Sequence, residues 1–292
     1  MPNASSPNRA TNQTRRSSLG RRLWASPVRR ICRDRSVILG YHGIARSPLR
    51  QDPSLLQVTP KRFRAQLELL LDAGFEFVTV AELVRLADGN EPPPGYAAVS
   101  FDDGMRNNLT TALPIMAEYK IPGTVYMTVG YFGGHSPWVK APADNRMLDE
   151  DELREVAGAG WEVGAHTMTH ADLSRLDYES CRREIEQSKD RLEQIVGGPI
   201  ETFAYPFGLR SEVAERAARD SGLLAAVSTG QGSWESFQIK RAMIGTLDPL
   251  AVVVMKLADR YEPLLRSRPL DLLRRASKRL RGGGPPADRA EA

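Results

Sequence analysis

Two pairs of polar side chains in the sequence have the types and the spacing of a metal-dependent catalytic site. Asp102 and Asp103 are adjacent and precede a glycine, whereas His166 and His170 lie four residues apart. A four-residue step can bring two imidazole rings to one side of a helical turn, so both could bind one ion. Two imidazoles and one carboxylate form a common catalytic metal set that leaves coordination positions open for water.

Each pair also has an ordinary structural interpretation. An Asp-Gly sequence favours turns, so the two aspartates could begin a loop or cap a helix. The two histidines could be unrelated surface or core residues, and their spacing alone favours that interpretation. Adjacent carboxylates after a buried strand are costly, however, unless a cation or hydrogen bonds match them. Whether the pairs form a site therefore depends on the elements that position them.

Strands and helices alternate between residues 36 and 262. Apolar runs such as 37–42 and 97–101 lack polar alternation, which is typical of strands in a buried parallel sheet. Helical spacing of apolar residues follows them, for instance after Thr59 and Pro60, a predicted N-cap and first helical residue. Roughly seven or eight such units predict an α/β fold with a single (β/α) barrel, seven-stranded and distorted or incomplete.

Four polar segments come at the carboxyl ends of predicted strands. They are residues 41–42 (Tyr-His), 100–104 (Ser-Phe-Asp-Asp-Gly), 166–170 (His-Thr-Met-Thr-His) and 203–208 (Phe-Ala-Tyr-Pro-Phe-Gly). In a parallel barrel these strand ends share one face, which is where barrel enzymes have their active sites. Four segments that are distant in the sequence are therefore predicted to converge.

This combination of motifs resembles the polysaccharide deacetylase family of carbohydrate esterases, which includes chitin, peptidoglycan and exopolysaccharide deacetylases. The resemblance covers roughly residues 36–262, the predicted catalytic domain. Residues 100–104 are similar to the family's first motif, usually Thr-Phe-Asp-Asp-Gly, and residues 166–170 to its His-[Ser/Thr]-x-x-His motif. Residues 203–208 resemble the third motif in the Tyr-Pro variant of the exopolysaccharide-modifying branch, in which an early Tyr-His, here Tyr41-His42, also ends the first strand.

The resemblance implies a role for each motif residue. Asp103, His166 and His170 would bind the metal, usually zinc or else another divalent ion. Asp102 would be the general base that takes a proton from metal-bound water as this water attacks the acetamide carbonyl. The backbone N–H of Phe207 would stabilise the resulting oxyanion.

The chain departs from the family pattern at two positions. The third motif often carries an arginine that orients the base, but Ala204 stands there; Arg241, beside a later strand end, is a candidate substitute or, equally, a surface residue. The family's late Leu-x-His motif is missing, because no histidine follows His170. The departing amine then needs another proton donor. His42 is the candidate general acid because it ends a strand on the expected face, and His135 is the alternative.

Other residues are candidates for substrate contact or for support of the site. Tyr205 and Pro206 belong to the third motif, and Trp138 lies in a long loop, residues 130–147, of a length that is often functional. Trp138, Trp234 and Phe237 could stack on a sugar or line an acetyl pocket, although packing in the core or a loop is the ordinary role of each. Thr167 is expected to hold the metal loop in shape.

The sequence therefore predicts a metal-dependent hydrolase that removes N-acetyl groups from an N-acetylated sugar, such as N-acetylglucosamine, in a glycan or glycan precursor. One alternative is a C–N hydrolase that acts on a small non-sugar amide. Another is a catalytically silent glycan-binding relative, which the alanine at position 204 and the missing late histidine suggest. The intact Asp102, Asp103, His166 and His170 argue against the silent relative.

Outside the predicted domain both ends of the chain are basic. Residues 1–35 are rich in Asn, Ser, Pro and Arg and predict a disordered tail. Residues 263–292 form a second tail, in which residues 269–281 could make a basic amphipathic helix that lies on an anionic membrane surface or packs on the barrel. No recognition module accompanies these basic residues, so we expect no nucleic-acid binding.

Composition and targeting signals limit the class of protein further. The hydrophobic fraction of 41% and the charged fraction of 26% are typical of soluble globular proteins. Cys32 and Cys181 form no CxxC pair, so neither a disulfide framework nor a cysteine zinc site is expected. The arginine pairs at 15–16 and 21–22 lack the apolar stretch of an export signal, and no spanning segment follows. We therefore expect a cytoplasmic protein, either free or peripheral to the inner membrane surface.

Overall fold

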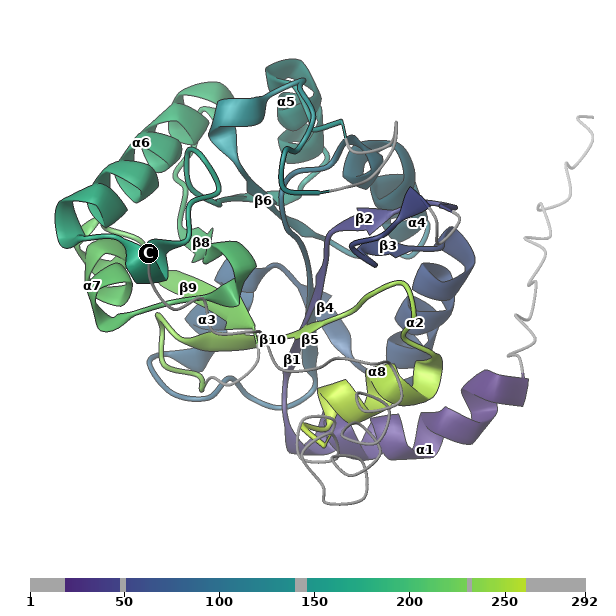
Figure 1. Ribbon diagram of the computed structural model, residues 1–292. Helices are drawn as coiled ribbons and strands as arrows, with labels where there is room; N and C mark the ends of the chain where they lie inside the picture. Colours follow the sequence, from purple (N-terminus) through teal and green to yellow (C-terminus); the bar gives the residue numbers. More distant parts are fainter. Residues whose placement is uncertain (1–18, 48–50, 140–145, 230–232, 261–292) are drawn as a thin grey trace, which may run out of the picture.

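The structure is a computed structural model, and it describes residues 19–47, 51–139, 146–229 and 233–260 (Figure 1). In this part of the chain, seven parallel strands close into a barrel. In order around the barrel they are β1 (Val37–Tyr41), β5 (Tyr96–Phe101), β6 (Thr124–Met127), β7 (Glu162–Ala165), β8 (Thr202–Ala204), β9 (Ala225–Thr229) and β10 (Ile239–Met243). The barrel closes at β1, where Leu39 is paired with Val99 of β5 and with Ala242 of β10. The predicted (β/α) barrel with seven strands is confirmed.

The barrel is distorted beside β5. A short strand, β4 (Glu76–Val78), pairs with the first half of β5, on the edge that β6 uses further along. Helix α3 (Val80–Ala87) follows β4 at once, and its first amides reach the amino ends of two barrel strands. Val80 N–H donates to Thr124 Oγ1 (3.0 Å), and Ala81 N–H donates to a carboxylate oxygen of Glu162 (2.9 Å). The start of α3 therefore closes the amino end of the barrel.

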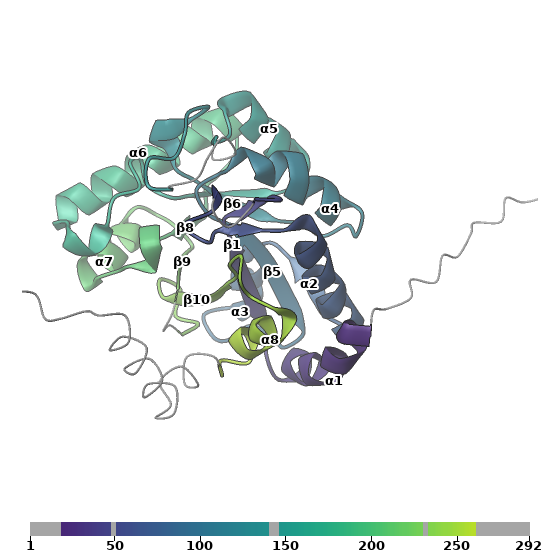
Figure 2. The ribbon, with the colours of Figure 1, turned by 45° about the vertical axis from the view of Figure 1, so that its right-hand side comes forward.

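Helices surround the strands on the outside, as Figures 1 and 2 show. They are α2 (Pro60–Ala73), α4 (Leu113–Ala117), α5 (Glu150–Gly158), α6 (Tyr178–Val196), α7 (Glu212–Asp220) and α8 (Leu250–Leu257). Shorter pieces are a π-helical turn (Asn108–Ala112), three 3₁₀ turns (Val129–Tyr131, Leu173–Arg175 and Pro206–Gly208) and a small parallel pair, β2 (Gly43–Ile44) and β3 (Gln57–Val58). Thr59 caps α2 and Pro60 is its first residue, as the sequence predicts.

The strands separate two packed layers. Val99, Phe101 and Val125 belong to the main core, which lies between the barrel and the helices. A second cluster contains Ala98, Tyr126 and other residues at alternate strand positions, such as Ala204 and Val227. It also contains Val80 and Leu83 of α3. Since alternate residues of a barrel strand point inward, this cluster is the barrel interior. The interior is thus filled by aliphatic side chains and the Tyr126 ring.

Helix α1 (Leu19–Asp34) corrects one expectation from the sequence. Residues 1–35 were expected to be disordered, but residues 19–34 form this helix, which packs against α2 and α8 (Figure 2). Val28, Ile31 and Cys32 are buried, at the i, i+3 and i+4 spacing of a helical stripe. The arginine-rich composition hid this stripe. The remaining residues of both predicted tails, including the amphipathic segment 269–281, lie outside the described residues. Among the described helices, none is long and apolar enough to span a membrane.

Candidate active site

Three of the predicted metal ligands come together at the carboxyl end of the barrel. Asp103 follows β5, and both His166 and His170 follow β7. Nε2 of His170 lies 3.3 Å from Oδ1 of Asp103, and Nε2 of His166 lies 3.6 Å from the same oxygen. One ligand atom from each residue lies within 4.8 Å of the other two, and all three residues are buried. The predicted ligand set is therefore one cluster in space.

The hydrogen bonds of these residues suit a cation. Nδ1 of His166 lies 2.7 Å from the carbonyl oxygen of Ala204, which can only accept, so Nδ1 carries the proton and Nε2 keeps a free lone pair. Both carboxylate oxygens of Asp103 are buried and have no hydrogen-bond donor within the described part of the chain. Burial opposes the ionisation of Asp103, but His166 and His170, when protonated at Nε2, outweigh it and lower the pKa of this carboxyl. A divalent cation would match the charge and the lone pairs of this arrangement.

The backbone at the site adopts conformations that are costly for residues other than glycine. Asp103, Thr167, His170 and Phe207 have φ angles of 71°, 63°, 60° and 59°. Such left-handed residues persist where surrounding contacts hold them, and they are frequent at functional sites. Thr167 supplies one of these contacts, as expected from the sequence, because its Oγ1 accepts the N–H of His170 (2.9 Å).

Asp102 has different neighbours from those of Asp103. The guanidinium of Arg241, in β10, donates to both carboxylate oxygens of Asp102, at 2.6 and 2.8 Å. Arg241 also donates to Ser100 Oγ (3.1 Å), and its side chain is fully buried. The alternative of a solvated surface arginine is therefore wrong. Burial opposes the ionisation of Asp102, but Arg241 outweighs it, so the pKa of Asp102 lies below its ordinary value.

His42 lies beside the two aspartates, directly after β1. The preceding residue, Tyr41, accepts the N–H of Asp102 on its carbonyl (2.8 Å), and the positive charge of a protonated His42 would lower the pKa of both Asp102 and Asp103. Its carbonyl accepts a hydrogen bond from Asn108 Nδ2 (2.8 Å), while its Nδ1 is buried and has no partner among the residues that the structure describes. His135, by contrast, is exposed, and its backbone pairs with Arg146.

Aromatic rings enclose His170. The Trp138 ring stacks on the imidazole with centroids 4.0 Å apart and planes 4° apart, and the Phe207 ring stands edge-on at 4.5 Å. Trp138 thus supports a predicted ligand. The Phe207 side chain is 56% exposed, so it borders both the site and solvent.

The other residues of the third motif are structural in their contacts. Tyr205 is buried and its hydroxyl donates to the carbonyl of Phe237 (3.2 Å), and Pro206 is buried as well. Gly208 has a φ of 68°, and a Cβ at this position would overlap the side chain of Thr229, so only glycine fits this turn. These contacts shape the turn that presents Phe207.

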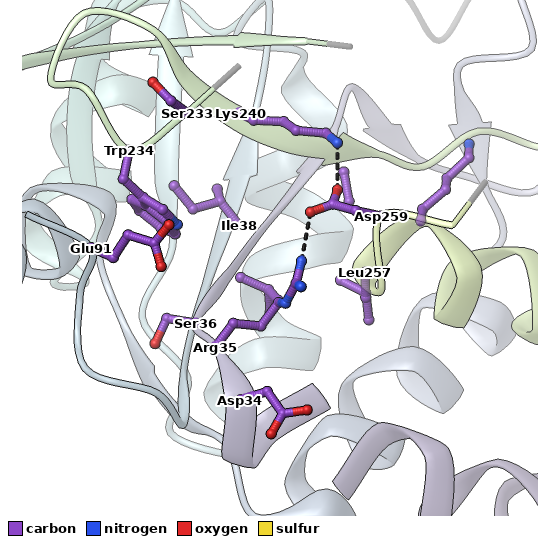
Figure 3. A pocket seen from close by; sticks show the side chains of 13 residues that line it. Asp34, Arg35, Ser36, Ile38, Glu91, Ser233, Trp234, Lys240, Leu257 and Asp259 are labelled. Carbon is purple, nitrogen blue, oxygen red and sulfur yellow. Dashed lines mark hydrogen bonds and ion pairs between the residues drawn. The ribbon is translucent and has the colours of Figure 1, made fainter. Parts of the chain in front are cut away.

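Two aromatic residues do not lie where a sugar-stacking role requires them. Trp234 packs against the interior cluster and lines a cavity of about 300 Å³ with Arg35, Ser36 and Lys240, which lie at or next to the starts of β1 and β10 (Figure 3). Phe237 is buried just before β10 and contacts Arg219. Both therefore belong to the amino end of the barrel and have the packing role, and the alternative of sugar stacking does not apply to them. Residue type alone does not say at which end of a strand a side chain lies.

Sequence reasoning missed three residues that organise the site. Asn107 Oδ1 accepts the N–H of Ile44 (3.2 Å), and Asn108 donates to His42, so this pair ties the segment after β1 to the segment after β5. Their position shortly after the Asp-Asp-Gly motif was a usable signal. Glu184 of α6 accepts three hydrogen bonds from the loop between His166 and His170, and no local pattern indicated it.

Comparison with known proteins agrees with this geometry. Residues 89–226 match the family model described as polysaccharide deacetylase. A Bacillus subtilis protein named for this family is 27% identical over 197 residues, which cover 67% of this chain and 65% of that protein. The poly-beta-1,6-N-acetyl-D-glucosamine N-deacetylase of Staphylococcus aureus is 24% identical over 175 residues, which cover 57% and 59%. The chain thus spans less than two thirds of the length of these relatives.

A solved structure is similar over most of both chains. The Streptococcus pyogenes deacetylase PplD, in complex with acetate, superposes with a TM-score of 0.65 at 26% sequence identity. The likeness covers 78% of this chain and 98% of that one. The barrel described above is therefore the arrangement of a known deacetylase.

Proposed function

We propose that this chain, whose residues 89–226 match the polysaccharide deacetylase family model, is a metal-dependent hydrolase that removes N-acetyl groups from an N-acetylated sugar in a glycan or glycan precursor. The observation that carries this proposal is the contrast between two adjacent carboxylates. Asp103 faces the two imidazoles, whereas Asp102 is held by the fork of Arg241. Two carboxylates in different environments can take two roles, one as ligand and one as base.

Asp103, His166 and His170 would hold the metal. Their set of two nitrogens and one oxygen suits zinc, and it leaves positions open for water and substrate. When bound, the cation would lower the pKa of a coordinated water and polarise the amide carbonyl. The proton on Nδ1 of His166, directed to Ala204, keeps Nε2 available as a ligand atom.

Asp102 would act as the general base. Arg241 holds this carboxylate ionised and fixes its plane, so Asp102 is ready to accept a proton from the attacking water. Each carboxylate oxygen has a second lone pair besides the one that Arg241 uses, so an acceptor position remains. In this way Arg241 would take the part of the arginine that the family often has where Ala204 stands here.

The remaining groups would handle the carbonyl oxygen and the leaving amine. The N–H of Phe207, in its left-handed turn, would donate to the oxyanion. Protonated His42 would give its proton to the departing nitrogen, since it lies beside the two aspartates and no histidine follows His170 in the chain. The exposed Phe207 ring would offer an apolar surface to the substrate.

The substrate and the setting are proposals as well. The name of the Staphylococcus aureus relative favours a polymer of N-acetylglucosamine as the first substrate to test. Contact with an anionic membrane through the basic ends is a further proposal, for which the exposed Arg29, Arg30 and Arg33 of α1 are the described part. The cytoplasmic location and the absence of nucleic-acid binding stay predictions.

Acetate release tests the proposed activity. Purified protein would be incubated with N-acetylglucosamine oligomers, sugar nucleotides, lipid-linked sugars and small non-sugar amides, each with and without added zinc. We expect zinc-dependent acetate release from the sugars. Release from the small amides alone would favour the C–N hydrolase, and no release from any compound by zinc-loaded protein would favour the silent relative.

A further inference from the structure

The loop between the two histidine ligands is held from outside by one carboxylate of α6. Oε2 of Glu184 accepts the backbone N–H groups of Met168 (3.0 Å) and Thr169 (2.9 Å). Oε1 of Glu184 accepts the hydroxyl of Thr169 (2.8 Å). Hydrogen bonds to a charged acceptor are stronger than neutral ones, and here three of them converge on two consecutive residues.

The opposite edge of the same loop is bound by the segment after β6. The N–H groups of Val129 and Gly130 donate to the carbonyls of Thr167 (3.2 Å) and Met168 (2.8 Å). A Cβ on Gly130 would lie 2.6 Å from the carbonyl oxygen of Met168, so only glycine allows this approach. The loop therefore has its amides fixed by Glu184 and its carbonyls fixed by the segment 129–130.

Such fixation matters because the loop is strained. Thr167 and His170 both have left-handed φ angles, which residues other than glycine rarely adopt. Without its outer contacts, the loop would relax toward ordinary backbone conformations, and the position of His170 would change with it.

The two histidine ligands differ in how they are oriented. His166 is directed by the hydrogen bond from its Nδ1 to Ala204. Nδ1 of His170 is buried and has no hydrogen-bond partner among the described residues. The direction of its Nε2 toward Asp103 therefore depends on the stacked Trp138 and on the backbone that Glu184 holds.

We propose that Glu184 is a positioning residue of the metal site, which keeps Nε2 of His170 directed at Asp103. This inference rests on the metal binding of the proposed function, but not on the identity of the substrate. Groups that orient metal ligands typically change metal affinity by about 10- to 100-fold when they are lost. Glu184 acts on His170 through the backbone of the two preceding residues, Met168 and Thr169, so a loss of zinc affinity in this range is expected.

The test is the dissociation constant for zinc, measured by competition with a chromophoric chelator. The variants are Glu184→Ala, Glu184→Gln and Thr169→Ala, with Glu186→Gln as control. Glu186 lies on the same helix and pairs with Arg182. Affinity should fall by about 10- to 100-fold for Glu184→Ala, less for Glu184→Gln, and least for Thr169→Ala, which loses one of three hydrogen bonds. The control should bind zinc as the wild type does.

Thermal unfolding of the metal-free proteins separates positioning from general destabilisation. We expect Glu184→Gln to bind zinc more weakly than the wild type, although its metal-free form unfolds within a few degrees of the metal-free wild type. Zinc affinity within twofold of the wild type in Glu184→Gln and Thr169→Ala would overturn the inference, even if Glu184→Ala fails to fold. Wild-type protein that binds no divalent metal would overturn the proposed function and this inference together.

Discussion

Asp102 and Glu162 are both carboxylates of the barrel, but the first follows β5 at the carboxyl end and the second begins β7 at the amino end. Asp102 is paired with the guanidinium of Arg241. Glu162 accepts from neutral groups, namely the hydroxyls of Thr124 and Thr202 and the N–H of Ala81. The carboxyl end of the barrel therefore pairs its buried carboxylate with a cation, whereas the amino end surrounds its buried carboxyl group with neutral hydrogen-bond donors.

The difference shows in the acidity of the two groups. Burial opposes ionisation at both, but Arg241 outweighs burial and lowers the pKa of Asp102, whereas the hydrogen bonds do not outweigh it and the pKa of Glu162 is raised. A base must be ionised in order to accept a proton. The carboxyl end, where the proposed base lies, is thus the one where a carboxylate is kept ionised, and the amino end uses its carboxylate to fasten α3 to β6, β7 and β8.

The largest effect is expected for Asp102→Asn. Loss of the base should lower the turnover number by up to about 10⁴-fold, the upper range for general base catalysis, while the protein keeps its metal. Acetate release and metal content would be measured on the same sample. Turnover equal to that of the wild type would remove Asp102 as the base.

Arg241→Met should leave the Asp102 charge buried without a partner. Breaking a buried ion pair typically costs about 3–5 kcal/mol, which denaturant unfolding at neutral pH would detect. Because the folded-state pKa of Asp102 is lowered, this stabilisation is present above pH about 4 and is lost as the pH falls through the folded-state value. The double variant with Asp102→Asn should recover part of the stability. If Arg241→Met were as stable as the wild type, the ion pair with Asp102 would not be what stabilises the carboxyl end of the barrel.

His42→Ala tests the proton donor. It should slow turnover by about 100-fold, near the lower range for general acid catalysis, with little change in zinc affinity. His135→Ala is the matched control, because this histidine is exposed, and its turnover should stay at the wild-type rate. If the loss occurs in His135→Ala and not in His42→Ala, the acid is assigned to the wrong histidine.

Glu162→Gln should have the smallest effect, because the amide oxygen can still accept from Ala81 and Thr124 while the Thr202 hydroxyl rotates to accept from the new amide N–H. The variant is informative because it changes how the free energy of unfolding depends on pH. The raised pKa of Glu162 means that the folded protein holds this proton more tightly, so wild-type stability should fall relative to Glu162→Gln as the pH rises above about 4.3. Denaturant unfolding of both proteins from pH 4 to 7 (about the range of these groups) measures the slope. If the stability of the wild type relative to Glu162→Gln stays constant or rises with pH, the pKa of Glu162 is not raised and the contrast with Asp102 fails.

The sequence predicted the barrel and the convergence of the polar motifs because both are local in their signals, whereas the resemblance to the family separated Asp103 as ligand from Asp102 as base. Apolar runs mark the strands, and each chemical motif directly follows one of them, so parallel topology alone brings Asp103, His166 and His170 to one face. The same argument placed His42 beside Asp102. It needed no knowledge of how the side chains pack.

The contacts that sequence reasoning left open or missed act across elements. The pairing of Arg241 with Asp102 depends on the neighbouring positions of β10, β1 and β5, and the contact of Glu184 depends on how α6 packs against the metal loop. Helix α1 was missed, and the role of Trp234 was left open, for a related reason. Composition and residue type do not reveal which side chains tertiary packing buries.

Removal and return of metal tests the central claim most directly. The protein would be stripped with a chelator and titrated with zinc, while acetate release from an N-acetylglucosamine oligomer is followed, with Asp103→Ala as control. We predict that activity is lost on stripping and returns in proportion to bound zinc until about one ion is bound per chain, with no return in the control. Undiminished acetate release from the stripped wild-type protein would contradict the account.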